Sequence, residues 1–309
     1  MFVNSGSKRK YDLAVVGHIV LDHISHGNKQ HVPQMGSPCV YSSLGARALN
    51  ASVILGSKVG YDFGRERLSW LHGRGIDIDQ VKQTDSQTTS FKIRYVDGHR
   101  TMWLLSKCSS LTDNDISDLP LSSAIHIGPI MREIPQSLAV SLTNRNAATC
   151  LDPQGYLRKV LPDRRIRKST WHNRRLLRKL DVLKVSADEA PAVIGSSNSS
   201  RKLMETGPQI IIITKAREGT IMWSKDSGKF AVPAYKTKVR DPTGAGDALA
   251  AAFLVTWVRT GDLQWSAAVA SAIASFVVEK TAGPPKFGTY KQVEKRAAKV
   301  LEGIARMNR

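Results

Sequence analysis

One stretch decides the fold of this chain: Asp241-Pro242-Thr243-Gly244-Ala245-Gly246-Asp247, which is followed at once by the apolar residues 248–258. A glycine-rich turn that opens a long helix presents unpaired backbone N–H groups and the positive end of the helix dipole, so it suits an anion such as a phosphate. The carboxylate of Asp247 can accept a proton from an attacking hydroxyl, although a carboxylate in a first helical turn also complements the dipole without any ligand. With two glycines beside it that allow close approach to the backbone, Asp247 indicates phosphoryl transfer.

The run resembles the C-terminal signature D-[TS]-T-G-A-G-D of the ribokinase-like (PfkB) carbohydrate kinase family, from which only Pro242 departs. The resemblance implies that Asp247 is the general base and that the backbone N–H groups of Gly244, Ala245 and Gly246 form an anion hole. Two other phosphate-binding motifs fit poorly. A Rossmann fingerprint lacks its third small residue at Leu249, and no Walker A motif with its lysine occurs.

Composition favours one ordinary globular unit. The 309 residues are enough for a single α/β domain with an appendage, so we expect one kinase domain over residues 1–309. No apolar run reaches about 18 residues, and the polar residues 1–10 lack a following signal-peptide core. Three widely spaced cysteines fit reduced thiols. We therefore expect a cytoplasmic protein with no membrane partner.

The charge balance is less ordinary, because the chain carries a formal net charge of +19. Much of the excess lies in residues 158–179, where ten basic residues are interleaved with Trp171 and His172 and opposed only by Asp163. Such a run could bind nucleic acid through phosphates and base stacking. A solvated helix face is the commoner explanation, so we expect a helix there and treat nucleic acid as a partner that the charge leaves open.

Short apolar runs alternate with helix-length segments along most of the chain. The predicted strands are residues 12–17, 123–128, 147–152, 181–185 and 209–214. This rhythm predicts an α/β fold, a doubly wound and mainly parallel sheet flanked by helices. Ligand-binding groups should then follow the carboxyl ends of the strands.

The acceptor site is predicted from two positions near the N-terminus. Asp22 lies five residues beyond Gly17, where a loop after the first strand would face a ligand crevice, although a loop aspartate can also be a simple turn former. The resemblance implies that Asp22 and Gly36 contact the acceptor, with Met35 departing from the usual Gly-Gly pair. We expect residues 39–55 to form the following helix and residues 60–64 to form a turn before a second helix.

A hairpin is predicted from two β-like runs, residues 89–95 and 100–105, joined through Asp97-Gly98. The resemblance implies that it forms a small β lid over the acceptor, made by residues of about 23–35 and 88–107. A lid would exclude water, which competes as a phosphoryl acceptor. A hairpin that merely edges the main sheet is the alternative.

Nucleotide and metal residues are implied more loosely. Ser186-Ala187-Asp188-Glu189 corresponds to the family's N-x-x-E motif, which assigns Mg²⁺ to Glu189, but the same pattern before a helix is also a capping box. The loop from Thr214 to Gly219 resembles T-x-G-x-x-G, with Ala216 replacing the first glycine. Thr214, Gly219 and Gly283 are therefore the implied nucleotide contacts.

These features predict a kinase that transfers the γ-phosphoryl group of ATP, with Mg²⁺, to a hydroxyl of a small polyhydroxylated substrate. Residues 128–133 and 152–158 resemble a branch of the family that includes inositol kinases. A sugar or an inositol-like polyol is therefore the acceptor that we expect first. A nucleoside kinase is one alternative, and a nucleic-acid-binding or regulatory protein on a kinase scaffold is another. A monovalent-cation requirement and a homodimer are left open.

Overall fold

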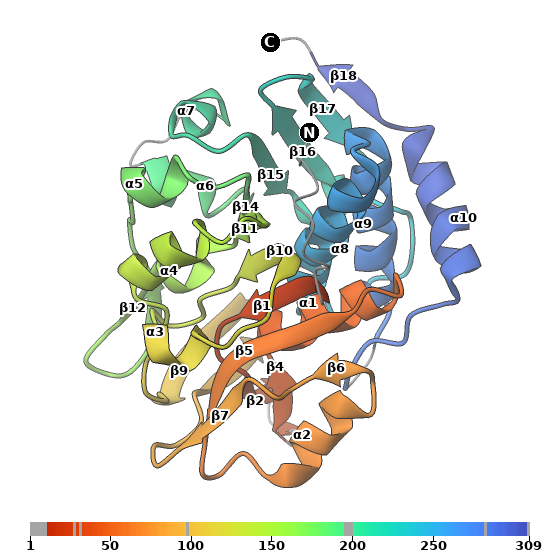
Figure 1. The fold of residues 1–309 in the computed structure, drawn as a ribbon. Helices are drawn as coiled ribbons and strands as arrows, with labels where there is room; N and C mark the ends of the chain where they lie inside the picture. The colour runs from red at the N-terminus through yellow and green to blue at the C-terminus, as the bar shows by residue number, and fades with distance from the viewer. Residues whose placement is uncertain are drawn as a thin grey trace.

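The computed structural model describes residues 11–26, 29–30, 33–96, 99–194, 200–280 and 283–307 (Figure 1). Its main sheet has the strand order β18-β17-β16-β15-β14-β11-β10-β1-β5-β6, with β7 also on β5. The strands are β1 (Tyr11–Val16), β5 (Val53–Gly60), β6 (Ile76–Asp77), β7 (Val81–Thr84), β10 (Ser122–Ile127), β11 (Ala148–Leu151), β14 (Val182–Ser186), β15 (Ile210–Thr214), β16 (Thr220–Ser224), β17 (Gly228–Val232) and β18 (Ala305–Met307).

The centre of the main sheet is parallel. β1 pairs in parallel with both β10 and β5, and the parallel pairing continues through β11 and β14 to β15. At the far edge, three neighbouring pairs are antiparallel: β15 with β16, β16 with β17, and β17 with β18. The predicted doubly wound, mainly parallel sheet is therefore confirmed, and each of the five predicted strands lies within one residue of an observed one.

Helices cover both faces of this sheet (Figure 1). Leu13 and Val15 of β1 point into a core shared with α1, α8 and α9, whereas Ala14 and Val16 point into a second core with α4 and α5. This alternation follows from the two-residue period of a strand. The helices are α1 (Pro38–Arg47), α2 (Arg65–His72), α3 (Asp113–Ile116), α4 (Gln136–Leu142), α5 (Arg174–Leu177), α6 (Ala190–Ile194), α7 (Ser200–Glu205), α8 (Ala245–Thr260), α9 (Leu263–Val278) and α10 (Tyr290–Leu301), with 3₁₀ turns η1 (Pro153–Gly155) and η2 (Ala216–Glu218).

A second sheet contains the predicted hairpin. Its strands are β2 (Val20–His26), β3 (Lys29–Gln30), β4 (Gln34–Gly36), β8 (Ser90–Val96) and β9 (His99–Ser106), in the order β3-β2-β8-β9 with β4 on β2. The hairpin β8–β9 thus pairs with β2 rather than edging the main sheet. Of the segments expected to form a lid, residues 27, 28, 31, 32, 97 and 98 lie outside the described residues.

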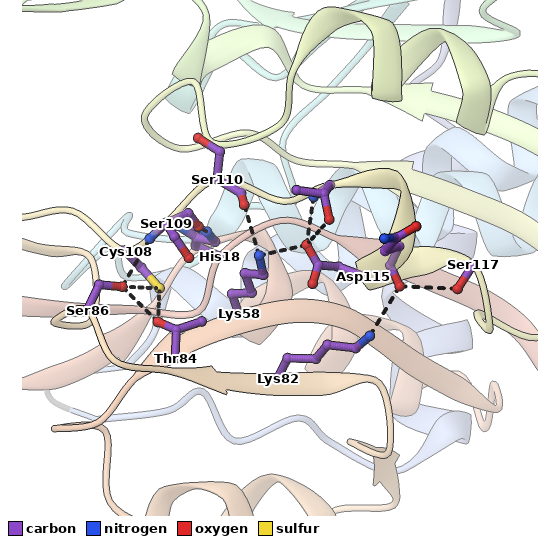
Figure 2. Close-up of polar contacts among 12 residues, drawn as sticks. His18, Lys58, Lys82, Thr84, Ser86, Cys108, Ser109, Ser110, Asp115 and Ser117 are labelled. Atoms are coloured by element: carbon purple, nitrogen blue, oxygen red, sulfur yellow. Dashed lines mark hydrogen bonds and ion pairs between the residues drawn. The ribbon is translucent and has the colours of Figure 1, made fainter.

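A polar network anchors the chain where it leaves the second sheet after β9 (Figure 2). Lys58 on β5 forms an ion pair with Asp115 at 2.6 Å and donates to the carbonyl of Ser110 at 3.0 Å. The ring Nε2 of His18 lies 3.0 Å from the carbonyl oxygen of Ser109. The segment after β9 is therefore held against the main sheet by side chains from β5 and from the loop after β1.

The expectation of one helix over residues 39–55 is wrong. α1 ends at Arg47, and β5 begins at Val53 with every one of its residues buried. Asn50 adopts a φ of 55°, a left-handed conformation that stops a helix. Apolar residues on both sides of Asn50 concealed this boundary, because a buried helix and a buried strand look alike in composition.

The expectation of a helix in the basic residues 158–179 is also wrong. The segment forms an antiparallel hairpin of β12 (Arg158–Val160) and β13 (Ile166–Lys168), followed by the one-turn helix α5. Trp171 is buried and stacks on Tyr156 at 4.9 Å between ring centroids, so it is not exposed for base stacking. The hairpin is joined to β9, because Arg164 donates to the carbonyl of Leu104 at 2.9 Å.

In the part of the chain that the structure describes, every helix is too short or too polar to cross a membrane. The three cysteines are buried, and none of them forms a disulfide.

Helix α8 fills the centre of one core, so we expect truncation of Phe253 to destabilise the whole domain. Phe253 is fully buried, and Phe253→Ala should lower the free energy of unfolding by about 3–5 kcal/mol. Leu121→Ala is the matched control, because Leu121 is 55% exposed. Denaturant unfolding of both variants measures the difference, and equal stability of the two would contradict this account of the core.

Candidate active site

The anion-binding turn is shaped by a glycine that no other residue could replace easily. Gly244 has a φ of 81°, in the left-handed region, and a Cβ there would lie 2.1 Å from the ring of Tyr41 on α1. The N–H of Ala245 donates to the carbonyl of Pro242 at 3.1 Å, so it is used within the turn. Among the described residues, the N–H groups of Gly244, Gly246 and Asp247 have no backbone acceptor outside α8. The anion hole formed by Gly244, Ala245 and Gly246 stays a prediction.

An ion pair holds the start of this turn. The ammonium of Lys280 lies 2.5 Å from a carboxylate oxygen of Asp241, and the Lys280 side chain is only 2% exposed. The other oxygen of Asp241 accepts from the N–H of Thr243 at 2.8 Å. Lys280 lies two residues beyond α9, so the pair ties the turn to the end of that helix.

Asp247 lies in the first turn of α8 and is buried. The pKa of its carboxyl is raised to about 7, mainly by burial and also by the neighbouring charge of Asp152, against the opposing effects of Lys184 and Arg158. Its Oδ1 accepts a hydrogen bond from the side-chain amide of Gln154 at 3.2 Å. A carboxylate with a pKa near neutrality is well matched to general-base work.

A lysine that sequence reasoning missed lies beneath the turn. Lys184 is in the middle of β14 and forms an ion pair with the buried Asp152 at 2.7 Å. A Cβ on Gly246 would lie 2.7 Å from the Lys184 ammonium. The signal was present in the sequence, because a lysine inside an otherwise apolar strand is rarely buried without a specific partner.

The two predicted acceptor residues are brought together. Gly36 on β4 faces Asp22 on β2, and a Cβ at Gly36 would lie 2.2 Å from the Asp22 carboxylate. Burial raises the pKa of Asp22 to about 6, and Arg100 and Arg158 oppose that rise. Arg158 also donates to the side-chain oxygen of Gln154 at 2.9 Å. Gln154 therefore links Arg158, near Asp22, to Asp247.

A cavity of about 900 Å³ opens on the other side of the turn. Thr214 and Gly219, which are predicted to contact a nucleotide, line it together with Ala245 and Gly246, whereas Gly283 is not among the lining residues. Leu249, Ala274 and Val278 supply apolar surface, and Lys215, Arg217, Lys236 and Lys238 supply positive charge. Ala216 adopts a φ of 48°, so it keeps the left-handed conformation that suits the glycine it replaces.

Glu189 forms the capping box that was the alternative to a metal role. Its Oε2 accepts from the N–H of Ser186 at 2.9 Å, and the hydroxyl of Ser186 accepts from the N–H of Glu189 at 3.2 Å. The charge of Glu189 still acts on Asp247 and Lys184, so it lies near both. Within the described ranges no group of three or more metal-ligating side chains occurs. Mg²⁺ that is bound together with substrate phosphates takes only one or two protein carboxylates and keeps several waters, so the carboxylate of Glu189 fits such an ion.

Comparison with known proteins agrees with this geometry. The family model described as pfkB family carbohydrate kinase matches residues 38–284. Cytidine kinase of Thermococcus kodakarensis is 25% identical over 263 residues, covering 82% of this chain and 91% of that protein. Nucleoside kinase of Methanothermobacter thermautotrophicus is 26% identical over 286 residues, covering 87% and 89%. A solved pyrophosphate-dependent kinase of the ribokinase family, complexed with a pyrophosphate analogue and myo-inositol, superimposes with a TM-score of 0.78 at 23% identity, covering 92% of this chain and 99% of that one.

Fold and site together define a phosphotransferase that uses a hydroxyl group as acceptor. The chain belongs to the pfkB family of carbohydrate kinases. Kinases of this family phosphorylate sugars or nucleosides. They use ATP, typically with Mg²⁺, although the pyrophosphate-dependent kinase described above is an exception.

Because the charge of Asp247 is buried, we expect a substitution that removes this charge to stabilise the protein, and to do so more at high pH than at low pH. Between about pH 4 and pH 7 the folded state holds a proton that the unfolded state has released, so stability falls as pH rises through this window. At about pH 8, Asp247→Asn should raise the free energy of unfolding by roughly 2–4 kcal/mol, and at about pH 4 it should change little. Thermal unfolding at both pH values measures this.

Asp226→Asn is the control for this experiment, because Asp226 lies in the exposed turn between β16 and β17. It should show no pH-dependent gain. A stabilisation by Asp247→Asn that is the same at both pH values would contradict the origin assigned to the effect.

Proposed function

We propose that this protein transfers the γ-phosphoryl group of ATP to a hydroxyl of a sugar or polyol, with Asp247 as general base. One observation carries the proposal. Asp247 lies in the first turn of α8, whose first two residues line the 900 Å³ cavity, and its carboxylate accepts a hydrogen bond from Gln154 on the side of Asp22 and Arg158. A base between a donor cavity and a polar acceptor wall is the arrangement that phosphoryl transfer needs.

In the proposed reaction the acceptor oxygen attacks the γ-phosphorus while the bond from phosphorus to the ADP oxygen breaks. The proton of the acceptor hydroxyl passes to Asp247. The free N–H groups at the start of α8 stabilise negative charge on the transferred oxygens, and their direction is fixed by the left-handed Gly244. Mg²⁺, when bound with ATP, neutralises phosphate charge, and Glu189 is the carboxylate that would hold it through water.

The second sheet is proposed to act as a lid over the acceptor. It carries Asp22 and Gly36 on β2 and β4, and Arg100 on β9 acts on the charge of Asp22. Closure of this sheet would remove water from the acceptor side of Asp247, which reduces hydrolysis of ATP.

A small neutral polyol suits the acceptor wall best. Asp22 accepts hydrogen bonds from hydroxyls, Arg158 donates them, and the amide of Gln154 can do both. Adjacent hydroxyls of an inositol or a sugar ring present this mixture in a compact shape. The complex of the solved pyrophosphate-dependent kinase with myo-inositol supports this choice. A nucleoside is the second candidate, supported by the two archaeal relatives.

ADP release measured across inositols, sugars and nucleosides tests the acceptor class. We expect turnover with a polyol or sugar and a drop in kcat of about 100-fold or more in Asp247→Ala, because the base contributes a positioned proton acceptor. Arg158→Met should raise the KM for the acceptor more than the KM for ATP.

Asp226→Asn is again the matched control and should keep full activity, since its side chain is exposed. Turnover of nucleosides alone would replace the polyol by the second candidate. An Asp247→Ala variant that folds and retains its activity would show that the base has been assigned wrongly.

We further infer that no added monovalent cation is needed. The carboxylate of Asp241 at the start of the anion-binding turn is already neutralised by the buried ammonium of Lys280. We expect equal rates in potassium chloride and tetramethylammonium chloride at the same ionic strength. Lys280→Met should lose activity and regain part of it with K⁺ or NH₄⁺, and strong activation of the unmodified protein by K⁺ would contradict this inference.

A further inference from the structure

Lys184 occupies a position where stability alone does not favour a lysine. It lies in the centre of β14 between residues that are fully buried, and its side chain is 8% exposed while that of Asp152 is 0% exposed. Removing both charges of such a pair from water costs free energy that their attraction seldom recovers in full. Apolar residues of similar volume would hold this part of the sheet at least as well.

The ammonium also lies at the wrong end of a helix. The positive pole of α8 is at its N-terminus, where cations are disfavoured and anions are favoured. Yet the Lys184 ammonium is packed against Gly246, in the first turn of α8. Asp152 and Asp247 offset part of this repulsion, and a negative group bound at the same point would offset it further.

Gly246 leaves space for this lysine. Unlike Gly244, it has no positive φ, and it lies inside α8. A Cβ at this position would lie 2.7 Å from the ammonium nitrogen and 3.2 Å from the adjacent carbon of Lys184. The second glycine of the signature therefore admits the ammonium to the underside of the anion-binding turn.

Lys184 remains charged in this setting. The charges of Asp152, Glu189 and Asp247 raise its pKa above the ordinary value, against the opposing effect of burial. The ammonium is held in one place by its 2.7 Å contact with Asp152, whose Oδ1 also accepts from the N–H of Gln154. A positive charge that is fixed before the reaction needs no reorganisation during it.

We propose that the fixed positive charge of Lys184 stabilises the negative charge of the phosphoryl group during its transfer. A P-loop lysine performs this role in nucleotide-binding proteins with a Walker A motif. During transfer, the oxygen–phosphorus bond to the acceptor forms, the bond to ADP breaks, and the acceptor proton leaves to Asp247. Negative charge on the three equatorial oxygens is then close to the turn above Lys184. The inference depends on phosphoryl transfer by the family and not on which acceptor is used.

The double variant Asp152→Asn/Lys184→Met tests this, because it removes both charges of the pair without leaving either partner buried alone. We expect kcat to fall by about 100-fold while the KM values for ATP and acceptor stay within about threefold. Binding of ADP alone should be unchanged, whereas binding of ADP with aluminium fluoride, acceptor and Mg²⁺, which resembles the transition state, should weaken by a similar factor. A merely structural pair would not separate these two affinities.

The matched control is the other buried lysine–aspartate pair, Lys58 and Asp115, which lie 2.6 Å apart with side chains 10% and 12% exposed (Figure 2). Lys58→Met/Asp115→Asn should keep kcat within about threefold. If Asp152→Asn/Lys184→Met folds and also keeps its kcat, the proposal is wrong. Should that variant fail to fold, Lys184→Arg and Lys184→Gln decide: the arginine variant should be at least about tenfold more active, and equal activity overturns the proposal.

Discussion

The burial of a carboxylate at the start of α8 is the constraint on which the rest of this site depends. Asp247 is shielded from water and lies beside a second buried carboxylate, Asp152, so its ionised form is costly. The groups that oppose this cost are the positive end of the helix, Lys184 and Arg158. Each of these groups is placed by a particular local structure: the left-handed Gly244 opens α8, Gly246 leaves space for Lys184, and Gln154 holds Arg158.

Much of the fold could be predicted because buried parallel strands leave a clear pattern. Strands such as β1 and β15 are short apolar runs that end at loops, and they were located to within one residue. The boundary between α1 and β5 could not be located in this way, since apolar residues continue through it. What separates them is the left-handed backbone of Asn50, a conformation that few sequence signals announce.

The site was predictable where it depends on one contiguous motif and unpredictable where it depends on pairing across the fold. The turn that leads into Asp247 is a single run of sequence, and Asp22 and Gly36 were brought together as expected. The partners of Lys184 and Lys280 are 32 and 39 residues away, respectively, so no local pattern links them. The prediction of a solvated helix for the basic residues 158–179 failed for a similar reason. The inward position of Trp171 depends on its contact with Tyr156, which no local pattern indicates.

The hairpin β12–β13, which contains part of the basic segment, connects two parts of the fold. Its first residue, Arg158, bonds to Gln154 beside Asp247, while its turn residue Arg164 is fastened to Leu104 on β9 of the second sheet. The hairpin thus connects the second sheet, proposed above to act as a lid, to the side chains around Asp247. If the second sheet closes as proposed, this connection would move Arg158 and Gln154 together with it, so that closure over an acceptor would also reposition the groups that contact Asp247.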